Sequence, residues 1–366
     1  MKILALPRDP NPYQRLLYGE LTELGAQVRY LGTLTRSHTV NALLLPLEMA
    51  YQRARGAQFV HLHWVFGFSF PAGRRVRASR WLSQAWFAAF LLAARLLRLR
   101  LAWTAHNVLP HAPVFADDVA ARRSLTRHSD VVFAHSAAAL DGLAALGAVP
   151  RRSLVIRHGP IGPAAPSRLR SPGLGGGPRT FLFFGKVEEY KGVEDLIAAF
   201  ARLPLAIRDN ARLTIAGRCG DASLRARLHP QPNVRLLLEH VPEAEVAGLL
   251  AEADVVVLPF RRVTTSGSAE LALAHGRPLV VPDLPGLAGL PATAVTRYDG
   301  STAGLAAALA GLAGAGQARL AAMSAAALEY SARASWHQVA LATLTEMESV
   351  LRAGDRPAPP PARVSS

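Results

Sequence analysis

The chain has 366 residues, 50% of them hydrophobic and 18% charged, and a formal net charge of +15. A chain of this length can bury more than one hydrophobic core, so two domains are expected. Its one cysteine, Cys219, excludes an intrachain disulfide and a cysteine-based zinc site, and a reducing compartment such as the cytosol fits this composition. The sequence shows no signal-peptide pattern and no uncharged apolar run of about 18 residues, so neither secretion nor a membrane span is expected.

The positive charge is concentrated in the first half of the chain. Residues 1–158 hold 20 Lys and Arg against 8 Asp and Glu, whereas the rest of the chain is almost balanced. Basic surfaces attract phosphate groups, which nucleic acids and anionic lipids both carry. No recognised nucleic-acid-binding motif accompanies the arginines, so the sequence favours a lipid surface over nucleic acid.

The first half alternates short apolar segments with amphipathic ones. This alternation predicts a parallel sheet with helices on both faces. The expected strands cover residues 2–6, 28–31, 59–64, 101–105, 130–134 and 154–157, and the expected helices include 13–24, 40–54 and 137–146.

Residues 73–100 form the most unusual segment of the first half. Arginines stand at both ends of a stretch that is rich in Trp, Phe and Leu. A basic, aromatic and apolar helix of this kind is typical of a helix that lies on an anionic membrane surface. The same pattern also fits a crossover helix packed on the sheet, with its arginines in solvent. Both interpretations stay open at the level of the sequence.

Several polar residues follow the predicted strands of the first half. His61 and His63 alternate with apolar residues and therefore share one face of a strand, but no third metal ligand stands near them. Asp117 and Asp118 could supply a carboxylate base for a reaction at a hydroxyl group. Aspartate at this place is also the usual N-cap of a helix, which is the interpretation that the pattern favours.

A Pro-, Gly- and Ser-rich stretch, residues 159–179, is predicted to link two domains. The expected domains are therefore 1–158 and 180–352, and the second again alternates strands and helices before it ends in Ala- and Leu-rich helices. Residues 353–366 contain the run APPPA and are predicted to be a disordered tail.

Two stretches of the second half combine a buried strand, a polar loop and the start of a helix. The first, 181–192, reads FLFFGKVEEYKG and places Lys186 and Lys191 after a strand. The second, 254–283, reads DVVVLPFRRVTTSGSAELALAHGRPLVVPD and has a hydroxyl- and glycine-rich loop before a helix. Free N–H groups at a helix N-terminus and two cations at the carboxyl end of a strand both suit a diphosphate.

The segment FGKVEEYKG, followed by PFRRVTTSGSAELALAHGRPLV, resembles the donor-binding half of GT-B glycosyltransferases. The resemblance is to enzymes of the family-four type, including bacterial mannosyltransferase-like members. It implies an α/β fold of two Rossmann-like domains that face a cleft: an N-terminal acceptor domain and a C-terminal nucleotide-sugar domain.

The resemblance also implies roles for individual residues. Lys186 and Lys191 match the basic residues that hold the diphosphate of the nucleotide-sugar, and Glu270 matches the glutamate that holds the ribose. The family has a second glutamate eight positions earlier, where this sequence has Arg262. In the first domain, TAHNVLPH resembles the family pattern that places a histidine beside the reacting sugar, which here is His106.

Further donor contacts follow from the local pattern. The loop and helix start at Thr265, Ser266, Gly267 and Ser268 offer N–H and hydroxyl donors to phosphate or sugar, and Arg218 follows a predicted strand on the same side of the sheet. Because lysines and a helix N-terminus already supply positive charge, no metal and no further cofactor is expected.

The sequence therefore predicts a hexosyltransferase that moves mannose or glucose from a GDP- or UDP-sugar to a lipid-linked or polysaccharide acceptor. The resemblance and residues 73–100 together predict a cytoplasmic protein that binds the inner face of the cell membrane peripherally. Two other functions remain open: an epimerase or phosphorylase on the same fold, and a non-catalytic GT-B scaffold, which the arginine at position 262 would suit.

Overall fold

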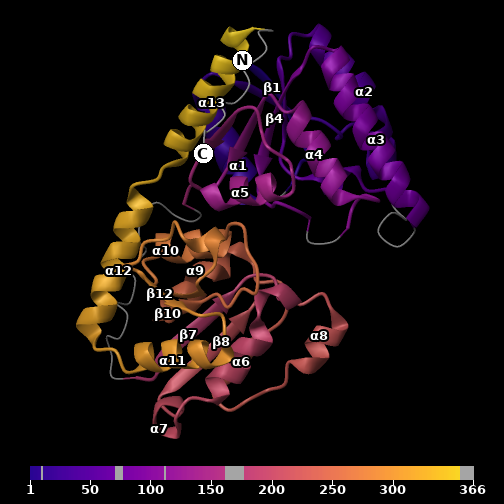
Figure 1. The fold of residues 1–366 in the computed structure, drawn as a ribbon. Helices are drawn as coiled ribbons and strands as arrows, with labels where there is room; N and C mark the ends of the chain where they lie inside the picture. Colours follow the sequence, from indigo (N-terminus) through magenta and orange to yellow (C-terminus); the bar gives the residue numbers. More distant parts are fainter. Residues whose placement is uncertain (10, 71–76, 111–112, 161–176, 355–366) are drawn as a thin grey trace, which may run out of the picture. The chain divides into compact units, whose positions relative to one another are not determined.

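A computed structural model describes residues 1–9, 11–70, 77–110, 113–160 and 177–354. The chain divides into two compact units (Figure 1). The first unit combines Met1–Arg157 with Trp336–Ser366, and the second unit is His158–Ser335. Most of the expected linker, residues 161–176, and residues 355–366 of the expected tail lie outside the described residues.

The described part of the first unit contains a six-stranded parallel sheet. Its order is β2-β1-β3-β4-β5-β6. Successive strands are added on one side of β1 and then, from β3 onward, on the other side, so the topological switch point lies between β1 and β3. Ligands of open α/β sheets bind at such a point, outside the carboxyl ends of the strands. The strands are β1 (Lys2–Leu6), β2 (Gln27–Tyr30), β3 (Phe59–Leu62), β4 (Arg100–Ala105), β5 (Val131–Ala134) and β6 (Ser153–Val155).

The helices of the first unit begin where the sequence supplies capping side chains. Asn11, Ser37, Asp117 and Ser136 each accept a hydrogen bond from a backbone N–H group of the helix that follows. The favoured capping role of Asp117 is thereby confirmed. The helices are α1 (Pro12–Glu23), α2 (His38–Ala54), α3 (Arg77–Leu96), α4 (Asp118–His128), α5 (Ala137–Ala145) and α13 (Trp336–Ala353), with a 3₁₀ turn η1 (Val65–Phe68) after β3.

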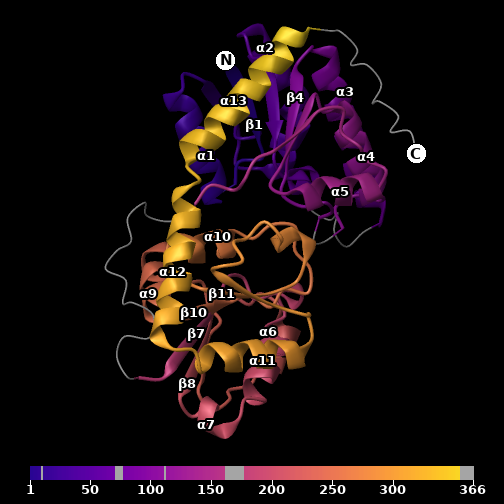
Figure 2. The same ribbon diagram turned by 60° about the vertical axis from the view of Figure 1, so that its left-hand side comes forward.

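The last helix corrects the domain boundary that the sequence suggested. Residues 336–352 were expected in the second domain, but α13 packs on the first unit and lies beside α1 in both views (Figures 1 and 2). The reason is an apolar stripe at helical spacing that enters the core beneath α1. Its buried residues are Trp336, Val339, Ala340, Leu344, Met347 and Val350.

The second unit holds another parallel sheet, with the order β12-β11-β10-β7-β8-β9 within the described residues. Its switch point lies between β7 and β10. The strands are β7 (Arg179–Phe184), β8 (Ala211–Ala216), β9 (Val234–Leu237), β10 (Val255–Val257), β11 (Leu279–Pro282) and β12 (Val295–Tyr298).

Helices and short 3₁₀ turns connect these strands and enclose the second core. They are η2 (Glu189–Lys191), α6 (Val193–Ala201), α7 (Leu205–Arg208), α8 (Ala222–Arg227), α9 (Glu243–Glu252), α10 (Gly267–Ala274), η3 (Pro285–Leu287), α11 (Thr302–Ala313) and α12 (Gln317–Ala332). Both units thus have the doubly wound α/β architecture that the sequence predicts.

Helix α3 has features of both interpretations of residues 73–100, the helix packed on the sheet and the helix on a membrane surface. One face, with Phe87, Phe90 and Leu91, is buried in the core of the first unit, whereas Trp81 and Leu96 on other faces are 58% and 74% exposed. Among the described helices, none is by itself long and apolar enough to cross a bilayer. The bent pair of helical segments 302–313 and 317–353 is long and apolar enough only when the two segments are counted together.

Candidate active site

The two lysines and the hydroxyl-rich loop that the sequence singled out lie on the two strands at the switch point of the second unit. Lys186 and Lys191 follow β7, and the segment Ser266–Glu270 follows β10, which pairs with β7 in parallel. The backbone N–H of Arg261 donates to the carbonyl of Tyr190 at 2.8 Å, which joins the two connections directly. The residues therefore gather where an α/β sheet binds its ligand.

Two glycines allow the loops to approach so closely. A Cβ atom on Gly192 would lie 2.0 Å from the carbonyl oxygen of Pro259, and a Cβ atom on Gly217 would lie 2.0 Å from that of Gly185. Both glycines have positive φ, 68° and 143°, which side-chain-bearing residues rarely adopt. Because Gly185 also lies near the Ser268 hydroxyl, with an added Cβ only 3.0 Å from Oγ, the loops after β7, β8 and β10 meet at one place.

Lys191 is held in an unusual environment. Its Nζ lies 4.3 Å from the ring centre of Phe260 and 5.2 Å from that of Tyr190, and no carboxylate among the described residues forms an ion pair with it. Burial lowers the pKa of the Lys191 ammonium to about 8; the nearby Glu188 carboxylate opposes this shift and the positive charge of Lys186 adds to it. An anion bound here would raise this pKa again, because it favours the charged form of the lysine.

The start of α10 supplies hydrogen-bond donors. Ser266 is the N-cap, and its hydroxyl accepts from the backbone N–H of Ala269 at 3.2 Å. That hydroxyl is engaged in the cap, so the donors that α10 presents are its first backbone N–H groups. Those of Gly267 and Ser268 donate to no backbone carbonyl in the described part of the chain. Two N–H groups at the positive end of a helix are suitable donors to an anion, so the structure leaves the predicted role of this loop in place as a prediction.

Glu270 lies in the first turn of α10 and is 8% exposed. The hydroxyl of Tyr330, on α12, donates to its Oε1 at 3.2 Å. Figure 2 shows α12 beside α10. The carboxylate is therefore fixed in direction by a second helix, which suits a group that holds ligand hydroxyls.

The remaining donor-side residues differ in their surroundings. Arg218 is exposed directly after β8, and Thr265 is half-buried in the loop before α10. Arg262, which stands where the family has an acid, is exposed with its guanidinium 5.8 Å from the ring centre of Tyr190. These positions agree with a polar rim around Lys191.

At the switch point of the first unit, four histidines and two hydroxyl residues form one hydrogen-bonded chain. His61 lies within β3, whereas the other three histidines directly follow β3, β4 and β5; Tyr18 comes from α1. The first half of the hydrogen-bonded chain connects Thr104 Oγ1 to His61 Nε2 at 2.8 Å, His61 Nδ1 to Tyr18 Oη at 3.1 Å, and Tyr18 Oη to His63 Nε2 at 2.6 Å. The second half connects His63 Nδ1 to His106 Nε2 at 3.0 Å, His106 Nδ1 to His135 Nε2 at 3.3 Å, and His135 Nδ1 to the Ile156 carbonyl at 3.0 Å.

The carbonyl at one end sets the direction of the chain. Ile156 can only accept, so His135 donates from Nδ1. With neutral rings, His135 Nε2 must then accept from His106 Nδ1, and His106 Nε2 must accept from His63 Nδ1. The remaining nitrogen of His63 accepts the hydroxyl proton of Tyr18. A single backbone carbonyl thus fixes the tautomer of each ring in the series.

Burial keeps the inner part of this chain uncharged. It lowers the pKa of His61 to about 3, and it lowers the pKa of His63 well below its ordinary value, with the neighbouring histidines adding to the effect. Burial also raises the pKa of Tyr18 well above its ordinary value. The inner part of the chain, formed by His61, His63 and Tyr18, is therefore a neutral, hydrogen-bonded array.

His106, the residue expected beside the sugar, is the member of the chain on which other rings converge. It is 7% exposed, Trp64 stacks on it with ring centres 4.5 Å apart, and Tyr13 meets it edge-on at 4.7 Å. Both of its ring nitrogens lie within hydrogen-bonding distance of neighbouring histidines. Trp64 is the more accessible ring of this group.

Sequence reasoning missed Tyr18, His135, Tyr330 and Phe260. Tyr18 and His135 are far from His61 and His63 in the sequence and meet them only because β3 and β5 belong to one sheet and α1 packs against that sheet. His135 directly follows an apolar strand, as His106 does, and that repeated strand-then-histidine pattern was a usable signal. Phe260 and Tyr330 carried no such signal.

Comparisons with known proteins agree with this geometry. Residues 178–314 match the family model "Glycosyl transferases group 1". A glycogen synthase of Mycobacterium tuberculosis is 31% identical over 242 residues, which are 64% of this chain and 58% of that protein. A GDP-mannose:glycolipid 4-beta-D-mannosyltransferase of Xanthomonas campestris pv. campestris is 29% identical over 110 residues, 29% of this chain and 30% of that protein. The chain thus spans less than two thirds of the length of these relatives.

Solved structures of similar fold cover nearly the whole chain. Anabaena HepE in complex with UDP matches 95% of this chain and 99% of its own with a TM-score of 0.67 and 15% identity. Sucrose-phosphate synthase from Thermosynechococcus elongatus matches 96% and 99% with a TM-score of 0.70 and 16% identity.

The two doubly wound units have the GT-B fold of these neighbours. The segment that matches the family of group 1 glycosyl transferases, residues 178–314, contains Lys186, Lys191 and Glu270, the residues to which the sequence resemblance gave roles in binding the donor.

Proposed function

We propose that the protein transfers a hexose, of the mannose or glucose type, from a GDP- or UDP-sugar to a lipid-linked or polysaccharide acceptor. The observation that carries this proposal is the partly buried Lys191, which lacks a carboxylate partner among the described residues and lies in loops that also hold Lys186 and the start of α10. Relatives named for glycogen and mannosyl transfer, and neighbours solved with UDP and UDP-glucose, support it.

In this reaction the bond between the sugar and the diphosphate breaks, and the diphosphate leaves with added negative charge. Lys186, Lys191 and the N–H groups of Gly267 and Ser268 would stabilise that charge, which is usually the largest contribution to such catalysis. Glu270, oriented by Tyr330, would accept hydrogen bonds from the ribose. The first unit would bind the acceptor near Trp64, with the histidine chain holding that surface in one arrangement.

Nucleotide binding tests the proposal directly. A ligand that binds only the folded state raises its stability by RT ln(1 + [L]/Kd), so the matching nucleoside diphosphate should raise the melting temperature most in a panel of UDP, GDP, ADP and TDP. Lys191→Ala should abolish that selective shift and lower transfer by about tenfold or more, because one charge-assisted contact to phosphate is lost. A wild-type protein that no member of the panel stabilises would argue against the donor site.

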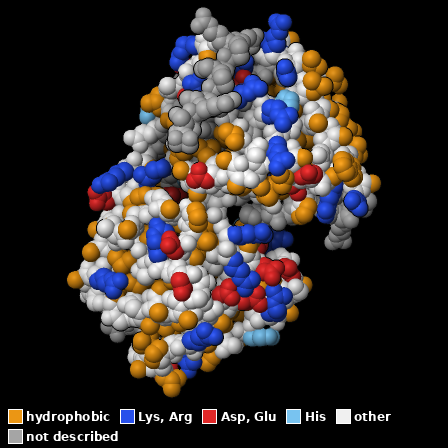
Figure 3. All heavy atoms as spheres, viewed as in Figure 1, with side chains coloured by type: hydrophobic (Ala, Val, Ile, Leu, Met, Phe, Trp, Pro, Cys, Tyr) orange, Lys and Arg blue, Asp and Glu red, His pale blue; other side chains and the backbone are white. Residues whose placement is uncertain are grey.

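A membrane-bound acceptor is supported by the surface of α2 and α3. The exposed apolar residues of α2 recur at helical spacing and form a stripe, and those of α3 form a second one. Figure 3 shows hydrophobic side chains gathered along the flank on which Figure 1 draws these two helices. The stripes contain Val40, Leu43, Leu47 and Tyr51 on α2, and Trp81, Leu82, Leu92 and Leu96 on α3.

We infer from these stripes that the protein binds the inner face of the cell membrane peripherally, as a cytoplasmic enzyme. Apolar side chains would enter the interface while neighbouring arginines contact anionic headgroups. Sedimentation with phosphatidylglycerol-containing vesicles should show binding that weakens with added salt and that Trp81→Ser with Leu96→Ser reduces. Equal sedimentation of the variant and the wild type would exclude this surface.

A further inference from the structure

A second cationic site lies in the first unit, at the amino ends of its strands, whereas the histidine chain lies toward their carboxyl ends. A cavity of about 1100 Å³ opens where β3, β4, β5 and β6 begin and where α2, α3, α4 and α13 end. β4 separates the two places, since Arg100 and His106 stand at its two ends, about 20 Å apart at the rise of a strand. A ligand in this cavity therefore cannot touch the histidines.

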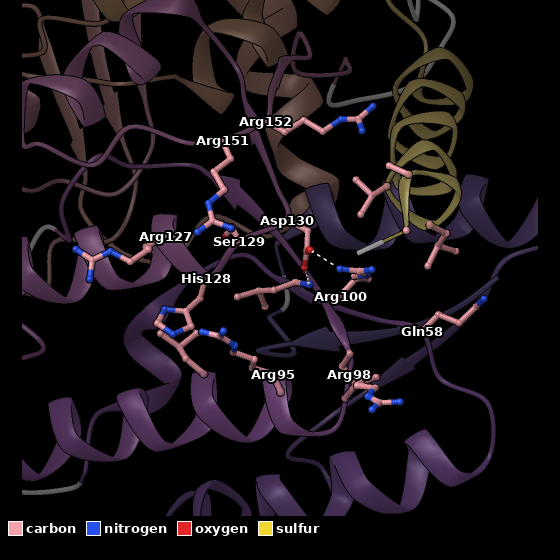
Figure 4. A pocket seen from close by; sticks show the side chains of 18 of the residues that line it. Gln58, Arg95, Arg98, Arg100, Arg127, His128, Ser129, Asp130, Arg151 and Arg152 are labelled. Atoms are coloured by element: carbon pink, nitrogen blue, oxygen red, sulfur yellow. Dashed lines mark hydrogen bonds and ion pairs between the residues drawn. The ribbon is translucent and has the colours of Figure 1, made fainter. Parts of the chain in front are cut away.

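Arginine dominates the lining of this cavity. Seven arginines contribute to it, against one carboxylate (Figure 4). In this view Arg95, Arg127 and Arg151 lie on one side of the Arg100–Asp130 ion pair, and Arg98 and Gln58 lie on the other side. The arginines are Arg53, Arg95, Arg98, Arg100, Arg127, Arg151 and Arg152.

Three of the arginines hold the walls together. Arg100 pairs with Asp130 at 3.1 Å and so ties β4 to the start of β5. Arg152 pairs with Glu346 and donates to Ser349 at 2.7 Å, which ties the start of β6 to α13. Arg53 donates to the Leu97 carbonyl at 3.0 Å and connects the ends of α2 and α3.

The other four arginines carry charge without a partner. Arg95, Arg98, Arg127 and Arg151 are exposed at the cavity, and none of them has a hydrogen bond or ion pair in the described part of the chain. Arg98 has a φ of 52° just after α3, at a position where glycine is the usual residue. The four guanidinium groups thus repel one another across a concave surface.

Helix ends explain only part of this charge. The carboxyl end of each helix carries about half a negative charge, so the four helices that end here offset roughly two arginines. Five arginines, Arg53 included, have no carboxylate partner among the described residues. About three positive charges remain uncompensated, which is more than helix termini or solubility require and which a concave surface concentrates.

We propose that this cavity binds a phosphate-bearing anion with at least two negative charges. Guanidinium groups bind phosphate through paired hydrogen bonds, and a diphosphate places the required charge in a small volume. The cavity is as large as those that hold nucleotide-sized ligands. The phosphate can come from a soluble metabolite or from a lipid headgroup, because the exposed Leu92 and Leu96 lie on the same end of α3.

Calorimetric titration of the full chain with inorganic pyrophosphate tests the site. Pyrophosphate should bind at this cavity and also at the lysines of the second unit. Arg98→Gln with Arg151→Gln should weaken pyrophosphate binding at the cavity by about tenfold or more, since each arginine gives a charge-assisted contact. Lys186→Ala with Lys191→Ala should remove binding at the lysines and leave binding at the cavity. Because the lysine pair reports the proposed donor site separately, failure of one proposal is distinguishable from failure of the other.

The matched control is Arg29→Gln with Arg36→Gln, which removes the same charge from exposed positions of the same unit outside the cavity. Vesicles of phosphatidylcholine with phosphatidylglycerol distinguish the two sources of phosphate. If the cavity variant loses pyrophosphate binding but binds vesicles as the wild type does, the ligand is a soluble anion. If the cavity variant loses pyrophosphate binding and also binds vesicles more weakly than the control variant does, the ligand is a lipid headgroup. Pyrophosphate affinity in the cavity variant equal to that of the control would overturn the proposal.

Discussion

If Lys191 holds the diphosphate as proposed, its lowered pKa should make nucleotide binding depend on pH, and the size of the effect can be calculated. Before a ligand binds, the pKa of this ammonium group is about 8, because the group is buried against Phe260 and Tyr190. A diphosphate beside it favours the charged form and should return the pKa toward its ordinary value of 10.5. Above the free pKa, binding must therefore be accompanied by proton uptake.

The magnitude follows from linkage between the two pKa values. Between about pH 7.5 and about pH 9, the affinity for a nucleoside diphosphate should fall roughly eightfold, and proton uptake should rise from about 0.2 to about 0.9 per ligand bound. The terminal phosphate does not interfere, since its second ionisation lies near pH 6 and is complete throughout this range. Titration calorimetry in buffers of different ionisation enthalpy measures the proton count directly.

Two variants separate Lys191 from other causes. Lys191→Met removes the titrating group, so affinity should be low and nearly independent of pH. Lys186→Met removes the same charge from the same connection but leaves Lys191 in place, so the pH dependence should persist at reduced affinity. Proton uptake that is unchanged in Lys191→Met would refute the assignment of the shifted group.

Three further predictions concern the framework of the sites. Gly217→Ala should lower the free energy of unfolding by roughly 2–4 kcal/mol in urea denaturation, because its Cβ would meet a carbonyl oxygen, whereas Gly220→Ala, which meets nothing within 4 Å, should not. Tyr330→Phe should weaken nucleotide binding several-fold in the thermal-shift assay without altering the unliganded melting temperature by more than a few degrees, since Glu270 loses the hydroxyl that orients it; unchanged binding would contradict that role. The pKa of His61 is about 3 in the folded state, so as the pH falls below about 6.5 the residue is protonated in the unfolded state before it is protonated in the folded state. This difference should lower the free energy of unfolding by about 2 kcal/mol at about pH 5. In His61→Gln, the free energy of unfolding should depend correspondingly less on pH.

Local sequence was sufficient to predict that the residues of the proposed donor site lie together in the second unit. Lys186, Lys191 and the segment Ser266–Glu270 lie in connections that follow apolar strands, and parallel strands bring their carboxyl ends to the same end of the sheet. The histidine chain could be anticipated only in part, since His61 and His63 share a face but Tyr18 and His135 arrive from distant elements. The partners of His106 in particular depend on the order of the strands, which no local pattern encodes.

Two features could not be predicted from the sequence, because they arise only from tertiary structure. The apolar stripe of α13 indicates that the helix is packed, but it does not say against which domain, and the choice falls on the first unit because its surface beneath α1 is complementary. The arginine cavity arises from eight element ends that meet only in the folded unit. In the sequence its arginines look like ordinary helix-terminal and loop residues.

The return of α13 to the first unit has a consequence for biosynthesis. On the ribosome, the first unit emerges without its final helix, and translation of residues 158–335 occupies roughly ten to forty seconds before Trp336 appears. During that interval the apolar surface beneath α1 is exposed to chaperones and to other nascent chains. Maturation of the amino-terminal half therefore waits for the last residues to be synthesised, and a fragment that stops at Arg157 should be prone to aggregation.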